Sequence, residues 1–158
     1  MPMIQPEIYA KPAAGIVGRR ANMEEWNTIT RVATAAGIGF GEPVQRGASA
    51  DLIAPLTTGK FLGITEADMT AVDGAPGAAA VFPAGYNTPV CDMGVIWGKA
   101  AGACTAGNVV YWSASSKGYT DTAASNTLVP NAEFDSSAAA NGIVKVRLRR
   151  VPAAPASP

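Results

Sequence analysis

Histidine is absent from this chain of 158 residues. Its absence removes the commonest general base, the histidine-activated serine and cysteine nucleophiles, and most transition-metal sites. Catalysis by carboxylates or lysine stays possible in principle, but no activated base is evident, and the aspartates are scattered singly rather than set in a calcium loop. We therefore expect a protein that is not an enzyme, with no catalytic residue, no cofactor and no metal site.

Cysteine, aromatic side chains and charge are also scarce. The two cysteines, Cys91 and Cys104, have a spacing that fits neither a CxxC motif nor a zinc ligand pair, so we expect buried, reduced thiols. Aromatic residues make up 7% and charged residues 15% of the chain, and the formal net charge is zero. A neutral chain has no global field that favours nucleic acid or an anionic membrane, so neither is an expected partner.

Long apolar runs are missing as well. No stretch approaches the roughly 20 apolar residues that a membrane-spanning helix needs. The opening residues "MPMIQP" have neither the basic start nor the apolar run of a signal peptide. We therefore expect synthesis in the cytoplasm.

Small and turn-forming residues are plentiful, with 17 glycines and 12 prolines beside 48% apolar residues. This composition is typical of a mainly β protein built from short strands. The sequence predicts three parts: an N-terminal arm with a possible short helix over residues 1–36, a β domain over residues 37–151, and a disordered Pro/Ala tail over residues 152–158. At most one short helix is expected.

The arm contains the segment "GIVGRR", in which apolar and cationic residues are flanked by glycines. Two interpretations are equally open. The segment could dock as an added strand or clamp on a partner, with its arginines pairing with carboxylates across the interface. Alternatively, it could be an ordinary first strand of the domain. Under the first interpretation, the candidate contact residues are Ile16, Val17, Arg19 and Arg20.

The short helix is predicted directly after the arm. Asn22 could be its N-cap, Glu25 could complete a capping box with Asn22, and Gly37 could end the helix. Apolar side chains recur at helical spacing at Met23, Trp26, Ile29 and Val32. The β-branched residues of "NTITRV" argue against a long helix.

Strands are predicted over much of the remaining chain: in "IGFGEPVQRG", over residues 60–65, 91–97 and 109–112, around Phe134, and over residues 143–148. The segments 91–97 and 109–112 are predicted to form a hairpin, with the odd positions of the first facing the core. The final strand alternates most cleanly, with Val144, Val146 and Leu148 facing inward. Residues 66–88 are expected to form a long surface loop.

Two motifs could bind an anion, but neither predicts a site. "GIGFG" lacks the GxGxxG spacing and leads into a predicted strand, so no helix dipole would face a phosphate. The cations within residues 145–150 could grip phosphate, form the solvated outer face of an edge strand, or pair with an acidic partner surface. Nucleic acid ranks last among these, because no aromatic residues are interleaved with the cations.

The order of these segments resembles the capsid cement, or head decoration, proteins of tailed bacteriophages. The resemblance covers about residues 15–112 and follows an arm, a Gly-Phe-Gly strand, a short apolar strand and a glycine-marked pair of strands. The matching positions are residues 39–41, 44, 46–47, 62–64, 94–97 and 106–111. Asn108 stands where the family often has aspartate, and Pro89 interrupts the approach to the predicted hairpin.

The resemblance implies a small β-barrel or β-tulip-like domain that binds the outside of an icosahedral phage head. Such a protein would stabilise contacts between major capsid subunits, often as a homotrimer, after synthesis in the host cytoplasm. Two alternatives stay open. The chain could be another phage structural β protein, in head completion, the neck or the tail, or it could be a carbohydrate-binding module that uses an exposed Trp112 or Tyr119.

Overall fold

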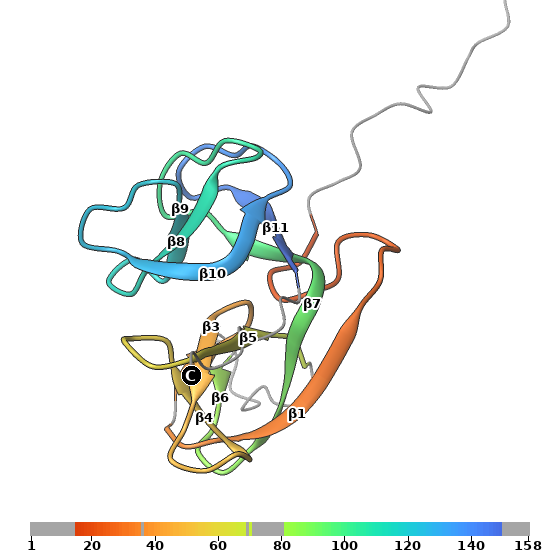
Figure 1. The fold of residues 1–158 in the computed structure, drawn as a ribbon. Coiled ribbons are helices and arrows are strands. Elements are labelled where there is room, and N and C mark those ends of the chain that lie inside the picture. Colours follow the sequence, from red (N-terminus) through yellow and green to blue (C-terminus); the bar gives the residue numbers. More distant parts are fainter. Residues whose placement is uncertain (1–14, 36, 69, 71–80, 150–158) are drawn as a thin grey trace, which may run out of the picture.

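The computed structural model describes residues 15–35, 37–68, 70 and 81–149, and these residues are all β, without a helix. Two groups of strands lie one above the other in Figure 1, and one long strand runs through both. The strands are β1 (Asn27–Ala33), β2 (Ile38–Gly39), β3 (Pro43–Arg46), β4 (Leu52–Pro55), β5 (Phe61–Thr65), β6 (Val81–Phe82), β7 (Asn87–Lys99), β8 (Val109–Ser113), β9 (Gly118–Thr120), β10 (Thr127–Phe134) and β11 (Ile143–Leu148).

A closed five-stranded barrel forms the first group. Its strands follow the order β1-β4-β3-β5-β7, and pairing of β1 with β7 closes the ring. The short strands β2 and β6 form a separate two-stranded sheet. The buried core of the barrel consists of Ala33, Ile38, Val44, Ile53, Leu62, Phe82 and Val90. The small β-barrel predicted from the sequence is therefore confirmed.

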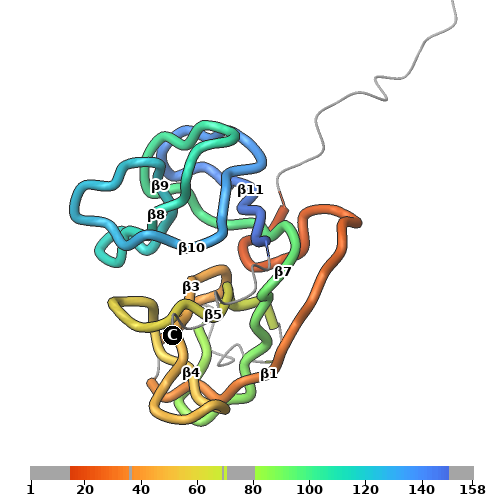
Figure 2. Tube along the Cα trace, in the orientation of Figure 1, coloured from red at the N-terminus to blue at the C-terminus, as the bar shows by residue number. Residues whose placement is uncertain are grey.

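The second group continues from β7 in the order β7-β11-β10-β8-β9. It curls until β9 meets the end of β7, where the Ala101 N–H donates to the Tyr119 carbonyl at 2.7 Å. The tube in Figure 2 shows this curled group above the barrel. Its core is lined by apolar side chains from every strand of the group, with Trp112, Tyr119 and Phe134 the largest. The predicted inward face of the last strand, Val144, Val146 and Leu148, is confirmed.

Strand β7 belongs to both groups. Its first half pairs with β1 and β5, and its second half pairs with β11. The register against β1 shifts between the two halves, which marks a bulge. Gly94 follows this bulge with a φ of 129°, and a Cβ there would lie 2.3 Å from the Trp26 ring. Glycine at position 94 therefore permits both the bend and the packing of Trp26.

The short helix predicted after Asn22 is wrong, because strand β1 occupies Asn27–Ala33. Helical spacing of apolar residues competed here with a run of β-branched residues, Thr28, Ile29, Thr30 and Val32. Such residues lose side-chain freedom in a helix and pack well on a pleated sheet. Pairing with β7 along most of its length, and with β4 at Val32 and Ala33, holds β1 in the barrel.

The predicted hairpin is also wrong, although both of its segments are strands. β11 lies beside β7, and β10 separates β11 from β8. The segment between β7 and β8 pairs instead with residues after β10, through mutual backbone hydrogen bonds of Cys104 and Ala138. After β7, the chain therefore crosses to the far side of β10, where β8 lies, instead of turning back to pair with β7.

The inward alternation predicted along β7 holds only in part, because a bulge interrupts it. Cys91 is fully buried, as expected. Beyond the bulge, Ile96 lies in the core of the second group. Val95 is also fully buried, although outside that core, and Trp97 is half-buried. One extra residue in a strand reverses the faces of all the residues that follow it.

Candidate interaction surface

Residues 15–21, here called the docked segment, lie against β7 of their own chain. The Gly18 N–H donates to the Trp97 carbonyl at 2.7 Å, and the Trp97 N–H donates to the Arg19 carbonyl at 2.9 Å. The Ala21 N–H donates to the Val95 carbonyl at 2.8 Å. These bonds use backbone groups of β7 that point away from β11. The segment thus adds a short strand-like stretch within the chain.

The docked segment turns three of its four candidate side chains outward. Ile16 is 58% exposed, and Arg19 and Arg20 are also exposed. Val17 is half-buried, with its Cγ1 2.6 Å from where a Cβ on Gly41 would lie. Val17 is therefore an internal anchor, and glycine at position 41 makes room for it.

Arg20 and Arg19 border a shallow hollow on this flank. The Arg20 guanidinium carbon lies 4.6 Å from the centre of the Trp26 ring, a cation–π arrangement. The opposite wall includes Glu66, which accepts a hydrogen bond from the Thr28 hydroxyl. Burial is the largest effect on Glu66 and raises the pKa of its carboxyl group. Hydrogen bonds from Thr28 and Trp26 and the positive charge of Arg20 lower this pKa, but by less.

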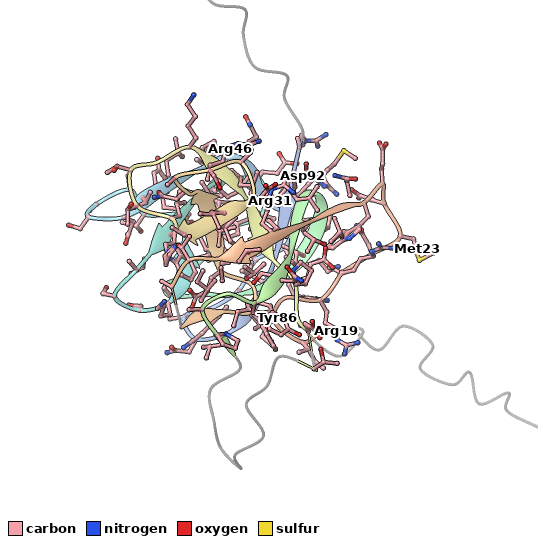
Figure 3. The ribbon with its side chains drawn as sticks, turned by 90° about the horizontal axis from the view of Figure 1, so that it is seen from below. Arg19, Met23, Arg31, Arg46, Tyr86 and Asp92 are labelled. Carbon is pink, nitrogen blue, oxygen red and sulfur yellow. The ribbon has the colours of Figure 1, made fainter. Side chains whose placement is uncertain are left out.

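A second carboxylate in the hollow is fixed by hydroxyl groups. Asp68 accepts hydrogen bonds from the Thr70 hydroxyl at 2.7 Å and from the Tyr86 hydroxyl at 3.1 Å. Hydrogen bonds from the side chain and backbone of Thr70 lower the pKa of Asp68. Figure 3 shows Tyr86 and Arg19 on the same side of the molecule, so the docked segment and this carboxylate share one flank.

The basic strand is neutralised mainly within the chain. The Arg147 guanidinium lies 2.6 Å from Asp135, 2.7 Å from Glu24 and 3.3 Å from Glu133, and Arg149 lies 3.0 Å from Glu133. Hydrogen bonds from Arg149 and Arg147 lower the pKa of Glu133. The charges available to an outside phosphate or acidic surface are correspondingly few.

Of the three alternatives for this basic strand, an edge position is wrong, because β11 lies between β7 and β10. Its acidic partners could have been anticipated from the sequence in part. Glu133 and Asp135 alternate along the chain as Arg147 and Arg149 do, and antiparallel neighbours place such residues face to face. Glu24 lies 123 residues from Arg147 and gives no comparable signal.

The possible carbohydrate platform is ruled out by burial. Trp112 is 4% exposed and Tyr119 is fully buried, and their ring centroids lie 5.0 Å apart. The Tyr119 hydroxyl donates to the Gly41 carbonyl at 2.7 Å. Both rings therefore belong to the core and offer no surface on which a sugar could stack.

One exposed side chain was not singled out by the sequence analysis. Met23 is 95% exposed at the turn before β1, the largest exposure among the big hydrophobic residues in the described ranges. Its helical spacing with Trp26 had placed it on the buried face of the predicted helix. Since that helix does not form, Met23 points outward instead, as Figure 3 shows.

Chemistry at an anion or metal site finds little support in the described residues. "GIGFG" is followed by β3, so no helix N-terminus faces it. Within the ranges described above, no three histidine, cysteine, aspartate or glutamate side chains gather where they could hold a metal ion. No helix there is long and apolar enough to cross a membrane.

Both cysteines are buried free thiols, as predicted. Burial raises the pKa of the Cys91 thiol far above its ordinary value and that of Cys104 to about 11. Because the thiolate is the reactive form, both should resist a disulfide reagent such as DTNB at about pH 8 in the folded protein. We expect two thiols to react only after denaturant is added. Rapid reaction of either thiol in the native protein would contradict this prediction.

Comparison with known proteins gives consistent results. A family model described as "Structural cement protein (E217 gp24/Pam3 gp6)" matches residues 4–149. A chain of the solved structure "The capsid of Myoviridae Phage XM1" is similar with a TM-score of 0.68 and 18% identity, over 94% of this chain and 99% of that one.

A second solved structure is less similar. "The crystal structure of head fiber gp8.5 N base in bacteriophage phi29" matches with a TM-score of 0.44 and 13% identity, over 79% of this chain and 95% of that one. No match was found among curated proteins. The likeness to the capsid chain shows a shared fold.

Proposed function

Because this chain belongs to the phage structural cement protein family, we propose that it binds the outside of an icosahedral head and stabilises contacts between neighbouring major capsid subunits. The observation that carries the proposal is the family match, which extends over residues 4–149. The protein is a capsid cement component of the virion and associates with the major capsid protein. Family membership implies a structural role rather than an enzymatic one.

Multivalency supplies the mechanism. A cement subunit that touches two capsid subunits makes its second contact as an intramolecular event, at a high effective concentration. Modest contacts repeated at equivalent lattice positions then add up to a stable shell. The closed barrel suits this role, because ring closure of β1 on β7 leaves the barrel no open edge.

The proposed contacts lie on the docked segment. Ile16, Arg19 and Arg20 would touch the major capsid protein or the next cement subunit, while Val17 anchors the segment on its own barrel. We also propose that the bound protein is a homotrimer and that its synthesis takes place in the host cytoplasm. Within the predicted arm of residues 1–36, the part that precedes β1 would contribute the contact, because β1 itself belongs to the barrel. The docked segment is supported as the contact because Ile16 and Arg19 are exposed on a stretch of backbone that is hydrogen-bonded to β7.

Co-sedimentation with expanded heads that lack their decoration tests the function. We expect saturable binding, with a copy number comparable with that of the major capsid protein, and improved survival of the heads on heating. Only a few copies per head would instead assign the protein to a vertex, neck or tail role. Deletion of residues 1–20 should abolish or strongly weaken binding, and unchanged binding would contradict the arm contact.

A single charge reversal tests the arm more gently. Arg19→Glu should weaken head binding about threefold to tenfold, because it replaces an attractive surface ion pair with a repulsive one. The loss should be smaller at high salt, which screens exposed charges. Lys60→Glu, at an exposed position away from the docked segment, is the matched control and should bind as the wild type does. Equal weakening by both variants would indicate a nonspecific charge effect.

A further inference from the structure

The turn formed by residues 22–25, here called the Met23 tip, carries an apolar side chain into solvent. Met23 is 95% exposed, and the residues beside it are polar or charged. We propose that Met23 inserts into an apolar pocket of the major capsid protein and so forms a second contact beside the docked segment. This inference rests on the proposed function and names the side chain that would recognise the partner.

The backbone of the Met23 tip is held from within and beside the turn. The Glu24 N–H donates to the Asn22 side-chain oxygen at 3.2 Å, which closes the turn. The Glu24 carboxylate lies 2.7 Å from the Arg147 guanidinium on β11. A tip held this way loses little conformational freedom on binding, so most of the gain from burying Met23 is retained as affinity.

The base of the tip is also fixed, by an aromatic side chain. Trp26 packs against Gly94 at the bulge of β7, and the Arg20 guanidinium covers the same ring at 4.6 Å from its centre. The tip is thus fastened at one end to β7 and at the other to β11. Only the methionine side chain is left free. Methionine adapts its shape to irregular apolar pockets, which suits a protruding contact residue.

Continuity with the docked segment places this contact beside residues already proposed to touch a partner, and the proposed cement function favours the major capsid protein as the occupant. Ala21, whose N–H binds the Val95 carbonyl, directly precedes the tip, so Arg19 and Met23 leave the same fixed stretch of backbone. Beside the tip lies a shallow hollow with Met93, Gly94 and Leu148 among its lining residues and with charged residues of both signs around them. The rim of a pocket that receives Met23 would rest in this hollow.

The test compares three variants for binding to undecorated heads. Met23→Glu should weaken binding about tenfold to hundredfold, the range expected when one buried methionine side chain is lost from a contact. Met23→Leu keeps the apolar volume and should stay within about threefold of the wild type. Leu128→Glu is the matched control, since Leu128 is 49% exposed on β10 and pairs with Tyr111 rather than with the Arg147 cluster, and it should bind as the wild type does.

The possible results separate a failure of the Met23 contact from a failure of the proposed function. Thermal unfolding midpoints should be equal for wild type and Met23→Glu, which shows that a binding defect is not a folding defect. Wild-type binding with unchanged binding by Met23→Glu overturns this inference and leaves the proposed function standing. A wild type that does not bind overturns both. Loss of self-association by Met23→Glu in sedimentation velocity, with head binding intact, would assign the contact to a second copy and also overturn the inference.

Discussion

Replacing Tyr119 with alanine should lower the free energy of unfolding by about 3–5 kcal/mol, the cost typical of deleting a buried aromatic ring. Tyr119 is fully buried, and its ring packs against Trp112 and beside Gly98 of β7. Its hydroxyl donates to the Gly41 carbonyl, which lies between β2 and β3. One side chain therefore joins the second group of strands to the barrel. Chemical denaturation followed by tryptophan fluorescence measures the loss.

Two further variants separate the parts of this contact. Tyr119→Phe keeps the ring and removes only the donor to Gly41, so it should cost about 1–3 kcal/mol. Tyr111→Ala, on a half-buried position of neighbouring β8, is the control and should cost about 1 kcal/mol. If Tyr119→Ala cost no more than this control, the joining role would be refuted.

Gly98 offers an independent check on the same packing. A Cβ at this position would lie 2.5 Å from the Tyr119 ring, so Gly98→Ala should destabilise by about 1–3 kcal/mol through overpacking. In a Tyr119→Ala background the added methyl meets no ring, and the cost of Gly98→Ala should fall. A double-mutant cycle measures this coupling directly, and additive costs would show that the two positions do not interact.

Replacing Arg147 with methionine should destabilise the protein by about 1–2 kcal/mol at neutral pH, a value reduced for the solvent exposure of the cluster. The substitution keeps much of the apolar stem and removes the charge that three carboxylates share. The Arg147 side chain is 24% exposed, and that of Asp135 is 19% exposed. Lys145→Met is the control on the same face of β11, because Lys145 covers the Trp97 ring at 5.3 Å from its centre and loses no carboxylate.

The pH dependence of the Arg147 effect has a definite sign. Hydrogen bonds from Arg149 and Arg147 lower the pKa of Glu133 below its ordinary value of 4.5. A carboxyl group with a lowered pKa stabilises the fold above its ordinary pKa, and this stabilisation disappears as the pH falls through the lowered value. The stability difference between wild type and Arg147→Met should therefore narrow below about pH 4.5. A difference that stays constant down to about pH 2 would argue against this cluster.

Local sequence patterns predicted where the strands lie better than they predicted which strands pair with one another. The alternation of Val144, Val146 and Leu148 identified β11 because one of its faces is buried. The same rule failed along β7, where a bulge at the register shift exchanges the two faces. The choice of β11 rather than β8 as the partner of β7 depends on contacts between residues far apart in the chain, which periodicity does not encode.

The candidate surface was predicted only where a local signal existed. Glycine-flanked apolar and cationic residues pointed to Ile16, Val17, Arg19 and Arg20. The structure exposes all of these side chains except Val17, which is half-buried. Met23 was missed because its spacing from Trp26 and Ile29 is compatible both with a helix and with a turn followed by a strand. Whether Met23 is buried depends on which of these forms, and tertiary pairing of β1 decided that.

The path of β7 through both groups of strands has a mechanical consequence. When one group is pulled away from the other, tension passes along the covalent backbone of β7 rather than across a ladder of hydrogen bonds. The ladders that hold β7 in each group, with β1 and with β11, run parallel to that pull and are loaded in shear, so several bonds must break together.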